Sequence, residues 1–263
     1  MNLFLKDKAV LVTASSKGLG KATALEFAKE GAKVLLSSRN EESLKKAAEE
    51  IKQLSGNSEV YFKVCDMSSA EDISNLVAAC KSLLGGVDVL INNTGGPVAG
   101  GFDAVTDEDW FAAFEKNLLS YIRTTREVIP YMKENGFGRI INISSSSTKE
   151  VIDNLILSNT FRSGMVGLTK SLAREMAPFN ILLNTVGPGR IATDRVAELD
   201  LISAERMSIP VDEVVSKFKG LIPMGRYGEP EEFAKVVVFL ASGANTYLTG
   251  QSLVIDGGML KAL

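Results

Sequence analysis

A run of small residues at positions 13–20 is the first place in this sequence where residue type and spacing suggest a chemical task. The run reads Thr-Ala-Ser-Ser-Lys-Gly-Leu-Gly, follows the apolar stretch 9–13 and leads into a segment with helical spacing. A tight turn between a strand and a helix aims backbone N–H groups and the positive end of the helix dipole at one point, where a pyrophosphate can bind. We therefore predict a dinucleotide site that includes Thr13, Ser15, Ser16, Lys17, Gly18, Leu19 and Gly20.

The residues after the second and third apolar runs indicate which dinucleotide is preferred. Sites for NAD usually place a carboxylate on the ribose 2′-hydroxyl after the second strand, but this sequence has Ser38 and Arg39 there. Arg39 and Lys17 carry the charge needed to hold a 2′-phosphate. We predict NADP(H) in preference to NAD(H). Asp66 and Met67, after the third run, join this site, where Asp66 either contacts the adenine or caps the following helix.

The composition excludes several other kinds of chemistry. The chain has no histidine, so a Ser-His-Asp triad, an imidazole metal site and a histidine base are absent. Its two cysteines, Cys65 and Cys80, have no metal-ligand spacing, so we expect buried thiols and no metal site. The net charge is −3, the basic residues are scattered, and no apolar run approaches the roughly 20 residues that span a bilayer. We expect a cytoplasmic protein with a small-molecule partner and neither nucleic acid nor membrane as partner.

Alternating strands and helices must position these residues. Apolar, β-rich runs occur at 9–13, 33–37, 60–64, 87–92, 138–144, 181–186 and 252–256. Segments with helical spacing occur between them, at 21–30, 41–54, 70–83, 107–134, 158–177 and 229–242. Strands this apolar need cover on both faces, which predicts one doubly wound α/β domain, a parallel sheet with helices on both faces. Ligands of such domains bind at the carboxyl ends of the strands.

The segment 190–222 departs from this alternation because it is polar, weakly periodic and longer than a typical connection. It is either a substrate lid or a helical excursion that only covers the core. Its apolar residues and its charges together suit sugars, acyl chains or steroid-like ketones, so the sequence does not identify a substrate.

Three motifs in order make the sequence resemble the short-chain dehydrogenase/reductase family, and in particular its 3-oxoacyl carrier-protein reductase and glucose dehydrogenase branch. They are the Gly-rich turn, Asn92-Asn93-Thr94-Gly95 and Val186-Gly187-Pro188-Gly189, and the likeness continues to Asp256-Gly257-Gly258. The resemblance implies a seven-stranded Rossmann-type sheet over residues 1–263 and hydride transfer between a nicotinamide cofactor and a carbonyl or secondary alcohol. It also implies a homo-oligomer, a tetramer or a dimer.

The resemblance assigns further cofactor contacts to residues that match. Asn93 and Gly95 are expected beside the adenine ribose, Thr193 near the nicotinamide amide, and Pro188 and Gly189 around that pocket. Ala14 replaces the first glycine of the family's turn. A backbone with negative φ would accept alanine there, so we expect cofactor binding to survive the replacement.

The catalytic positions depart from the family pattern, which is a serine, a Tyr-x-x-x-Lys pair and a helix asparagine. Asn117 and Ser145 stand at the expected places, but alignment of residues 167–173 puts Ser158 at the tyrosine position and Arg162 at the lysine position. No shift of register restores a tyrosine, because none occurs between Tyr131 and Tyr227. A serine hydroxyl is far less acidic than a phenol, whose pKa is roughly 10, and arginine does not relay protons at ordinary pH.

Three hypotheses follow from this departure. In the first, hydride transfer persists, with Ser145, Asn117 and Arg162 binding the carbonyl oxygen and a water ordered by Ser158 supplying the proton. In the second, Lys149 or Glu150 has taken over the role of the acid. In the third, the protein binds a dinucleotide with little or no turnover and acts as a sensor or partner subunit.

Overall fold

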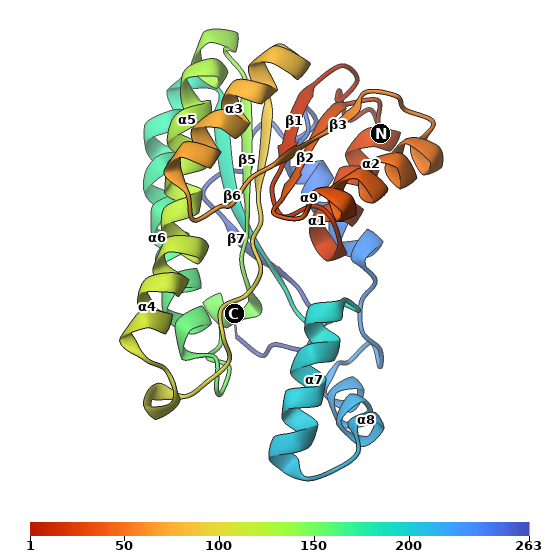
Figure 1. The fold of residues 1–263 in the computed structure, drawn as a ribbon, viewed down its shortest axis with the longest axis vertical. Coiled ribbons are helices and arrows are strands. Elements are labelled where there is room, and N and C mark those ends of the chain that lie inside the picture. Colours follow the sequence, from red (N-terminus) through yellow and green to blue (C-terminus); the bar gives the residue numbers. More distant parts are fainter. Residues whose placement is uncertain (263) are drawn as a thin grey trace.

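A seven-stranded parallel sheet forms the centre of the computed structural model, which describes residues 1–262 (Figure 1). Leu263, the last residue of the expected domain, lies outside the described residues. The strand order is β3-β2-β1-β4-β5-β6-β7. The strands are β1 (Ala9–Val12), β2 (Lys33–Ser38), β3 (Val60–Val64), β4 (Val89–Asn92), β5 (Gly138–Ile143), β6 (Ile181–Pro188) and β7 (Ser252–Ile255). This sheet confirms the predicted fold class.

Helices cover both faces of the sheet, as the apolar strands require. Helices α1 (Gly18–Lys29), α2 (Glu41–Ser55) and α9 (Pro230–Leu240) lie on one face. Helices α3 (Ala70–Leu84), α5 (Ser120–Asn135) and α6 (Ile156–Met176) lie on the other. Side chains of a strand alternate between faces, so Val10 and Val12 pack in the first core and Leu11 packs in the second.

Local signals fix the ends of these helices. Asn40 caps the start of α2 and Ser69 caps the start of α3, each through a side-chain oxygen that accepts a backbone N–H. Gly56 and Gly85 end the same two helices with φ of 70° and 90°, a conformation that costs glycine little. The chain also contains short 3₁₀ segments, η1 (Phe102–Ala104), η3 (Ser146–Thr148) and η4 (Ala177–Phe179).

The segment expected as one helix over 107–134 is interrupted. Helix α4 (Asp107–Phe114) passes into a π-helical segment, η2 (Glu115–Leu119), before α5 begins. A π turn holds one residue more than an α turn and rotates the side chains that follow it, and such turns occur frequently at functional sites. Asn117 lies within this turn and is completely buried.

The segment 190–222 forms two helices, α7 (Asp194–Met207) and α8 (Val211–Leu221), which extend beyond the carboxyl ends of the strands (Figure 1). We call residues 190–222 the lid. Asp200, buried on α7, forms an ion pair with Arg190 and accepts a hydrogen bond from the Tyr227 hydroxyl at 3.0 Å. The Arg190 guanidinium carbon lies 3.2 Å from the centre of the Phe218 ring on α8. These contacts dock both lid helices onto the body of the domain.

None of the helices in residues 1–262 is long and apolar enough to cross a membrane.

Candidate active site

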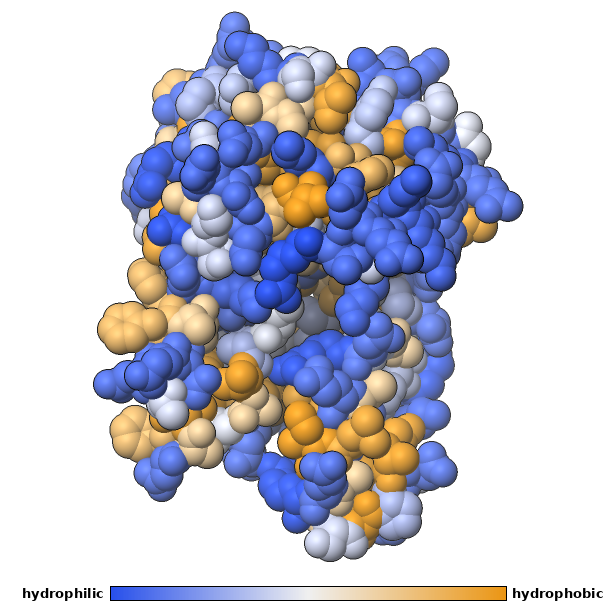
Figure 2. All heavy atoms as spheres, viewed as in Figure 1, coloured by the Kyte–Doolittle hydropathy of each residue, from blue (hydrophilic) through white to orange (hydrophobic). Residues whose placement is uncertain are grey.

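A cavity of about 880 Å³ lies at the carboxyl ends of the strands, between the body of the domain and the lid. Figure 2 shows a recess near the middle of the molecular surface, between these two parts. Its wall combines the Gly-rich turn, the loops that follow β2 to β6, one side of α6 and the inner side of the lid. This is the edge of the sheet at which the sequence predicted a ligand site.

The Gly-rich turn lines one end of the cavity through Ser16, Lys17, Gly18 and Leu19. Gly20 lies behind the turn, where an added Cβ would stand 2.5 Å from the Ala14 carbonyl oxygen. No side chain other than hydrogen fits that distance, so Gly20 permits the tight turn without lining the cavity.

Thr13 and Ser15 also lie behind the turn and connect it to neighbouring strands. The Thr13 hydroxyl donates to the Asn93 carbonyl oxygen at 2.7 Å and accepts from the Asn93 N–H at 2.8 Å. The Ser15 hydroxyl donates to the Val12 carbonyl oxygen at 2.7 Å and accepts from the Ser37 N–H at 2.9 Å. Both side chains are completely buried, so they hold the turn in shape instead of reaching the cavity.

The expectation of a negative φ at Ala14 is wrong. Ala14 has φ of 45°, in the left-handed region that favours glycine. The turn needs this conformation because the backbone reverses between β1 and α1 within a few residues. Alanine is small enough to adopt it, at a cost of about 1–2 kcal/mol.

The loops after β2 and β3 provide a second part of the wall, with Ser38, Arg39, Asp66 and Met67. Arg39 forms no ion pair within residues 1–262, whereas the Lys17 ammonium lies 3.1 Å from the Asp194 carboxylate, with both side chains exposed to solvent. The guanidinium of Arg39 is thus available to an anionic ligand.

Asp66 does not cap the following helix, because Ser69 does. One carboxylate oxygen of Asp66 instead accepts two hydrogen bonds from Ser68, from its N–H at 3.0 Å and from its hydroxyl at 2.8 Å. These bonds, the backbone one first, lower the pKa of Asp66 below its ordinary value. The carboxylate is therefore ionised and fixed at the cavity wall.

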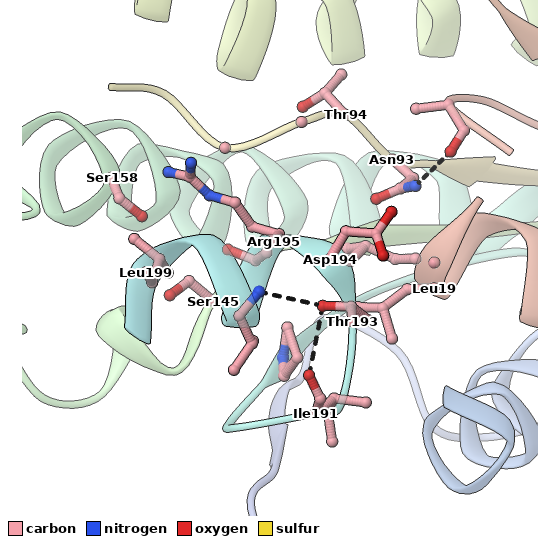
Figure 3. Close-up of a pocket in the computed structure, with 18 of the residues that line it drawn as sticks. Leu19, Asn93, Thr94, Ser145, Ser158, Ile191, Thr193, Asp194, Arg195 and Leu199 are labelled. Atoms are coloured by element: carbon pink, nitrogen blue, oxygen red, sulfur yellow. Dashed lines mark hydrogen bonds between the residues drawn. The ribbon is translucent and has the colours of Figure 1, made fainter. Parts of the chain in front are cut away.

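Asn93 and Gly95, on the loop after β4, line the middle of the cavity. The Asn93 side-chain amide donates to the Ala14 carbonyl oxygen at 3.1 Å, so it joins this loop to the Gly-rich turn (Figure 3). The same loop is held from the other side by Asn117, whose amide donates to Thr94 Oγ1 at 2.9 Å and to the Gly95 carbonyl oxygen at 2.8 Å. Asn117 does not itself line the cavity, and its Oδ1 has no partner.

Ser145, Ser158 and Arg162 line the same cavity as the Gly-rich turn. Ser145 follows β5, and its hydroxyl accepts the Ser147 N–H at 3.1 Å. Ser158 and Arg162 lie one turn apart on α6, so both face the same way. Ser145 and Ser158 both appear among the cavity-lining side chains in Figure 3.

The Arg162 guanidinium is held in place by neutral groups alone. Its Nη1 donates to the Ile143 carbonyl oxygen at 2.8 Å and to the Tyr121 hydroxyl at 3.1 Å. The Tyr121 hydroxyl in turn donates to the same carbonyl oxygen at 3.0 Å. Sequence reasoning missed Tyr121, although its position four residues after Asn117 on a helical segment placed it on the same face.

Thr193, Pro188 and Gly189 complete the wall at the base of the lid. Thr193 caps α7 by accepting the Val196 N–H at 3.4 Å (Figure 3). An added Cβ at Gly189 would stand 2.5 Å from the Asp256 Cβ, so β6 and the C-terminal segment approach closely here.

Lys149 and Glu150 are exposed and do not line the cavity. The hypothesis that one of them acts as the acid therefore has no geometric basis.

Cys65 and Cys80 are buried and unpaired, as the sequence predicted.

Comparisons with known proteins identify the family of this chain. The sequence model of the enoyl-(acyl carrier protein) reductase family matches residues 13–260. The 3-oxoacyl-[acyl-carrier-protein] reductase FabG of Aquifex aeolicus is 35% identical over 98% of this chain and its own full length. The NADPH-dependent reductase BacG of Bacillus subtilis is 32% identical over the same shares. The structure of L-sorbose reductase from Gluconobacter frateurii, complexed with NADPH and L-sorbose, superimposes with a TM-score of 0.94 at 30% identity and covers 100% of both chains.

These relatives match over whole chains, in sequence and in fold. The chain therefore belongs to the short-chain dehydrogenase/reductase family and is an NAD(P)-dependent oxidoreductase that acts on CH–OH groups.

Proposed function

We propose that this protein transfers hydride between NADP(H) and a carbonyl or secondary-alcohol substrate, with Ser158 and Arg162 in the places of the family's tyrosine and lysine. The observation that carries the proposal is that Ser145, Ser158 and Arg162 line the same cavity as the Gly-rich turn. The Gly-rich turn would hold the pyrophosphate of a dinucleotide bound in this cavity, which the three side chains also line.

The residues fit the cofactor in shape and in charge. Ser16, Lys17, Gly18 and Leu19 of the turn line the cavity, and so does Arg39, which forms no ion pair within residues 1–262. We assign the 2′-phosphate to Arg39 with help from Lys17, and therefore a preference for NADPH over NADH. BacG is named an NADPH-dependent reductase, and the L-sorbose reductase structure contains NADPH, which supports this preference.

The bound cofactor supplies the hydride, and the side chains of this chain stabilise the charge that forms on the substrate oxygen. The Ser145 hydroxyl and the Arg162 guanidinium donate hydrogen bonds to that oxygen as it becomes an alkoxide. Ser158 orders a water that delivers the proton, because neither a serine nor an arginine side chain is acidic enough to do so at neutral pH. Asn117 is a positioning residue, since it holds the loop of Thr94 and Gly95.

The proposal includes a homo-oligomer, a dimer or tetramer, in the cytoplasm. The edge strand β7 is only half-buried, and Phe111 and Phe114 of α4 expose 74% and 39% of their surface. Both features favour contact with further copies of the chain. The two unpaired cysteines favour a reducing compartment. Light scattering of the purified protein tests the assembly, and a monomer at all concentrations would contradict it.

The experiment for the reaction is NADPH oxidation with a panel of ketones, aldehydes and sugars, measured for the unmodified protein and for Ser158→Tyr combined with Arg162→Lys. Turnover by the unmodified protein supports the proposal. Turnover by the double variant alone contradicts it, because the unmodified protein would then bind NADPH without a working proton donor.

Thermal shifts measured with NADPH and with NADH test the cofactor preference. The rise in melting temperature is expected to be larger with NADPH, and the difference between the two cofactors is expected to vanish in Arg39→Gln.

A further inference from the structure

Arg162 is a buried cation without a counter-ion. Its side chain is 4% exposed, and no carboxylate within residues 1–262 forms an ion pair with it. The other arginines of the cavity wall near the lid are neutralised, Arg190 by Asp200 and Arg195 by Glu198. A buried charge is costly unless it is paired, so the structure leaves this charge for a ligand to neutralise.

The guanidinium of Arg162 also has nitrogens without hydrogen-bond partners in the described chain. Only Nη1 has partners, and within the described chain Nε and Nη2 have none. Neither nitrogen is sealed inside the protein, and the residue lines the cavity. Arg139, the other arginine buried to this degree, differs because its Nε, Nη1 and Nη2 all donate to backbone carbonyl oxygens. Burial alone therefore does not leave an arginine with free donors in this fold.

The free edge of a guanidinium, Nε and Nη2, is a planar fork that matches two oxygens lying in one plane. Ser145 and Ser158 line the same cavity, and their hydroxyls add donors. Apolar side chains also line the cavity: Ile152, Leu155, Leu199, Phe218, Leu221 and Met259. A fork for two oxygens beside an apolar wall suits a small anionic head with a hydrocarbon chain.

From this arrangement we infer that the substrate is a 2-oxo acid with an apolar chain, and that Arg162 binds its carboxylate and the adjacent carbonyl oxygen through Nε and Nη2. The inference rests on the proposed hydride transfer and names its substrate class. In a 2-oxo acid the two oxygens on neighbouring carbons reach both arms of the fork together. The carboxylate neutralises Arg162, and the arm on the carbonyl oxygen then stabilises the alkoxide that forms there.

The test compares 2-oxooctanoate, its methyl ester and 2-octanone as substrates for NADPH oxidation. The three share one hydrocarbon chain, and only the first is an anion. We expect kcat/KM for the acid to exceed that for the ester by about 10- to 100-fold, the range that charge-assisted hydrogen bonds provide. In Arg162→Gln this ratio is expected to fall to about 1, and in Arg162→Lys, which keeps the charge without the fork, to an intermediate value. The matched control is Arg174→Gln, an exposed position on the same helix, which should keep the wild-type ratio.

A binding measurement without turnover accompanies the kinetics. Oxamate is a 2-oxo acid analogue that hydride does not reduce, and methyl oxamate is its neutral form. With NADPH present, oxamate is expected to raise the melting temperature of the wild type and of Arg174→Gln, but not of Arg162→Gln. Methyl oxamate and sulfate at the same concentration should have no effect. Equal protection by sulfate would mean an adventitious anion site only, and would overturn the inference.

Different results would contradict the 2-oxo acid substrate and the proposed hydride transfer. If the ester and the ketone are reduced at least as well as the acid, and Arg162→Gln slows all of them equally, the 2-oxo acid inference is wrong and the proposed reductase stands. If oxamate protects only proteins that keep Arg162 while none of the three compounds oxidises NADPH, the anion site is supported and the proposed hydride transfer is contradicted.

Discussion

At the scale of single residues, the site depends on how Arg162 is held. Tyr121 and the Ile143 carbonyl oxygen bind the same nitrogen, Nη1, and so fix which edge of the guanidinium faces the cavity. Tyr121 is completely buried on α5 and does not line the cavity. It is a positioning residue whose effect passes through Arg162.

Replacing Tyr121 by Phe removes one acceptor of Arg162 and leaves the ring packing intact. We expect the free energy of unfolding to fall by about 1–2 kcal/mol, the usual cost of losing a buried hydrogen bond. We expect kcat to fall several-fold while KM for NADPH stays unchanged, because the cofactor binds mainly through other residues. Urea unfolding and steady-state kinetics check the two effects. An unchanged kcat would show that Arg162 keeps its orientation without the tyrosine.

Ala14 allows a second prediction, because its φ of 45° is unfavourable for any residue with a Cβ. Ala14→Gly relieves about 1–2 kcal/mol of backbone strain and adds about 0.4–1 kcal/mol of unfolded-state entropy. The difference is an expected net gain of between about 0 and 1.6 kcal/mol in the free energy of unfolding. Chemical denaturation measures it. A loss of stability would mean that the Ala14 methyl packs more favourably than its conformation costs.

The sequence predicted which residues belong to the site better than it predicted the direction and contacts of each side chain. The types and order of Ser16, Gly18, Asn93 and Thr193 sufficed to place them on one cavity wall, because strand ends in a parallel sheet converge. The sequence did not show that Thr13 and Ser15 turn away from the cavity, since a side chain's direction depends on local backbone angles. Nor did it show that the amide of Asn117 binds the β4 loop, because that contact joins residues far apart in the chain.

At the scale of elements, the lid and the π turn are the two features that alternation of strands and helices did not predict. The amphipathic spacing over 107–134 was continuous, so one helix was expected where α4, η2 and α5 occur. A π turn accommodates one extra residue, and tertiary packing favours it there. The helix propensities of the residues do not reveal its position. The segment was located by its departure from the alternation, and a helical excursion was one of its two interpretations, but the bounds of α7 and α8 were not predicted because its hydrophobic pattern is weak.

Asp200 is the centre of a polar cluster that helps to dock the lid, and a single substitution can break it. Asp200→Asn removes the ion pair to Arg190 and leaves that guanidinium partly buried without a counter-charge. We expect faster hydrogen exchange in α7 and α8, no change in the sheet, and a several-fold rise in KM for the substrate. Glu198→Gln is the matched control, because its ion pair to Arg195 is exposed and contributes about 0–1 kcal/mol. Exchange that speeds up equally across the sheet would argue that Asp200 stabilises the whole domain instead of the lid.

At the scale of the whole molecule, the fold is the level that the sequence determined best. Seven apolar runs predicted seven parallel strands, and each strand lies within a few residues of its predicted bounds. The reason is physical: a strand buried on both faces has a strong signal of its own, independent of distant residues. Contacts between residues that are far apart in the sequence have no such local signal.

Two buried thiols make the stability of the whole domain depend on alkaline pH. Burial raises the pKa of Cys65 and of Cys80 to about 12 in each case. Since these folded-state values lie above the unfolded value of about 8.5, the stabilisation is fully present below that pH and is lost as pH rises toward 12. We expect the free energy of unfolding to decrease between about pH 8.5 and 12, and to decrease less steeply in Cys80→Ala. Equal slopes for the variant and the wild type in urea titrations would contradict this.

The central claim is that the serine and arginine site transfers hydride. The most direct measurement uses NADPH carrying deuterium at nicotinamide C4, in separate pro-R and pro-S forms, with the unmodified protein and a carbonyl panel that includes 2-oxo acids. The account predicts that one of the two forms delivers its deuterium to the carbonyl carbon of a substrate, seen as a mass increase of one unit in the product alcohol. Tight binding of NADPH with no deuterium in any alcohol product would contradict it.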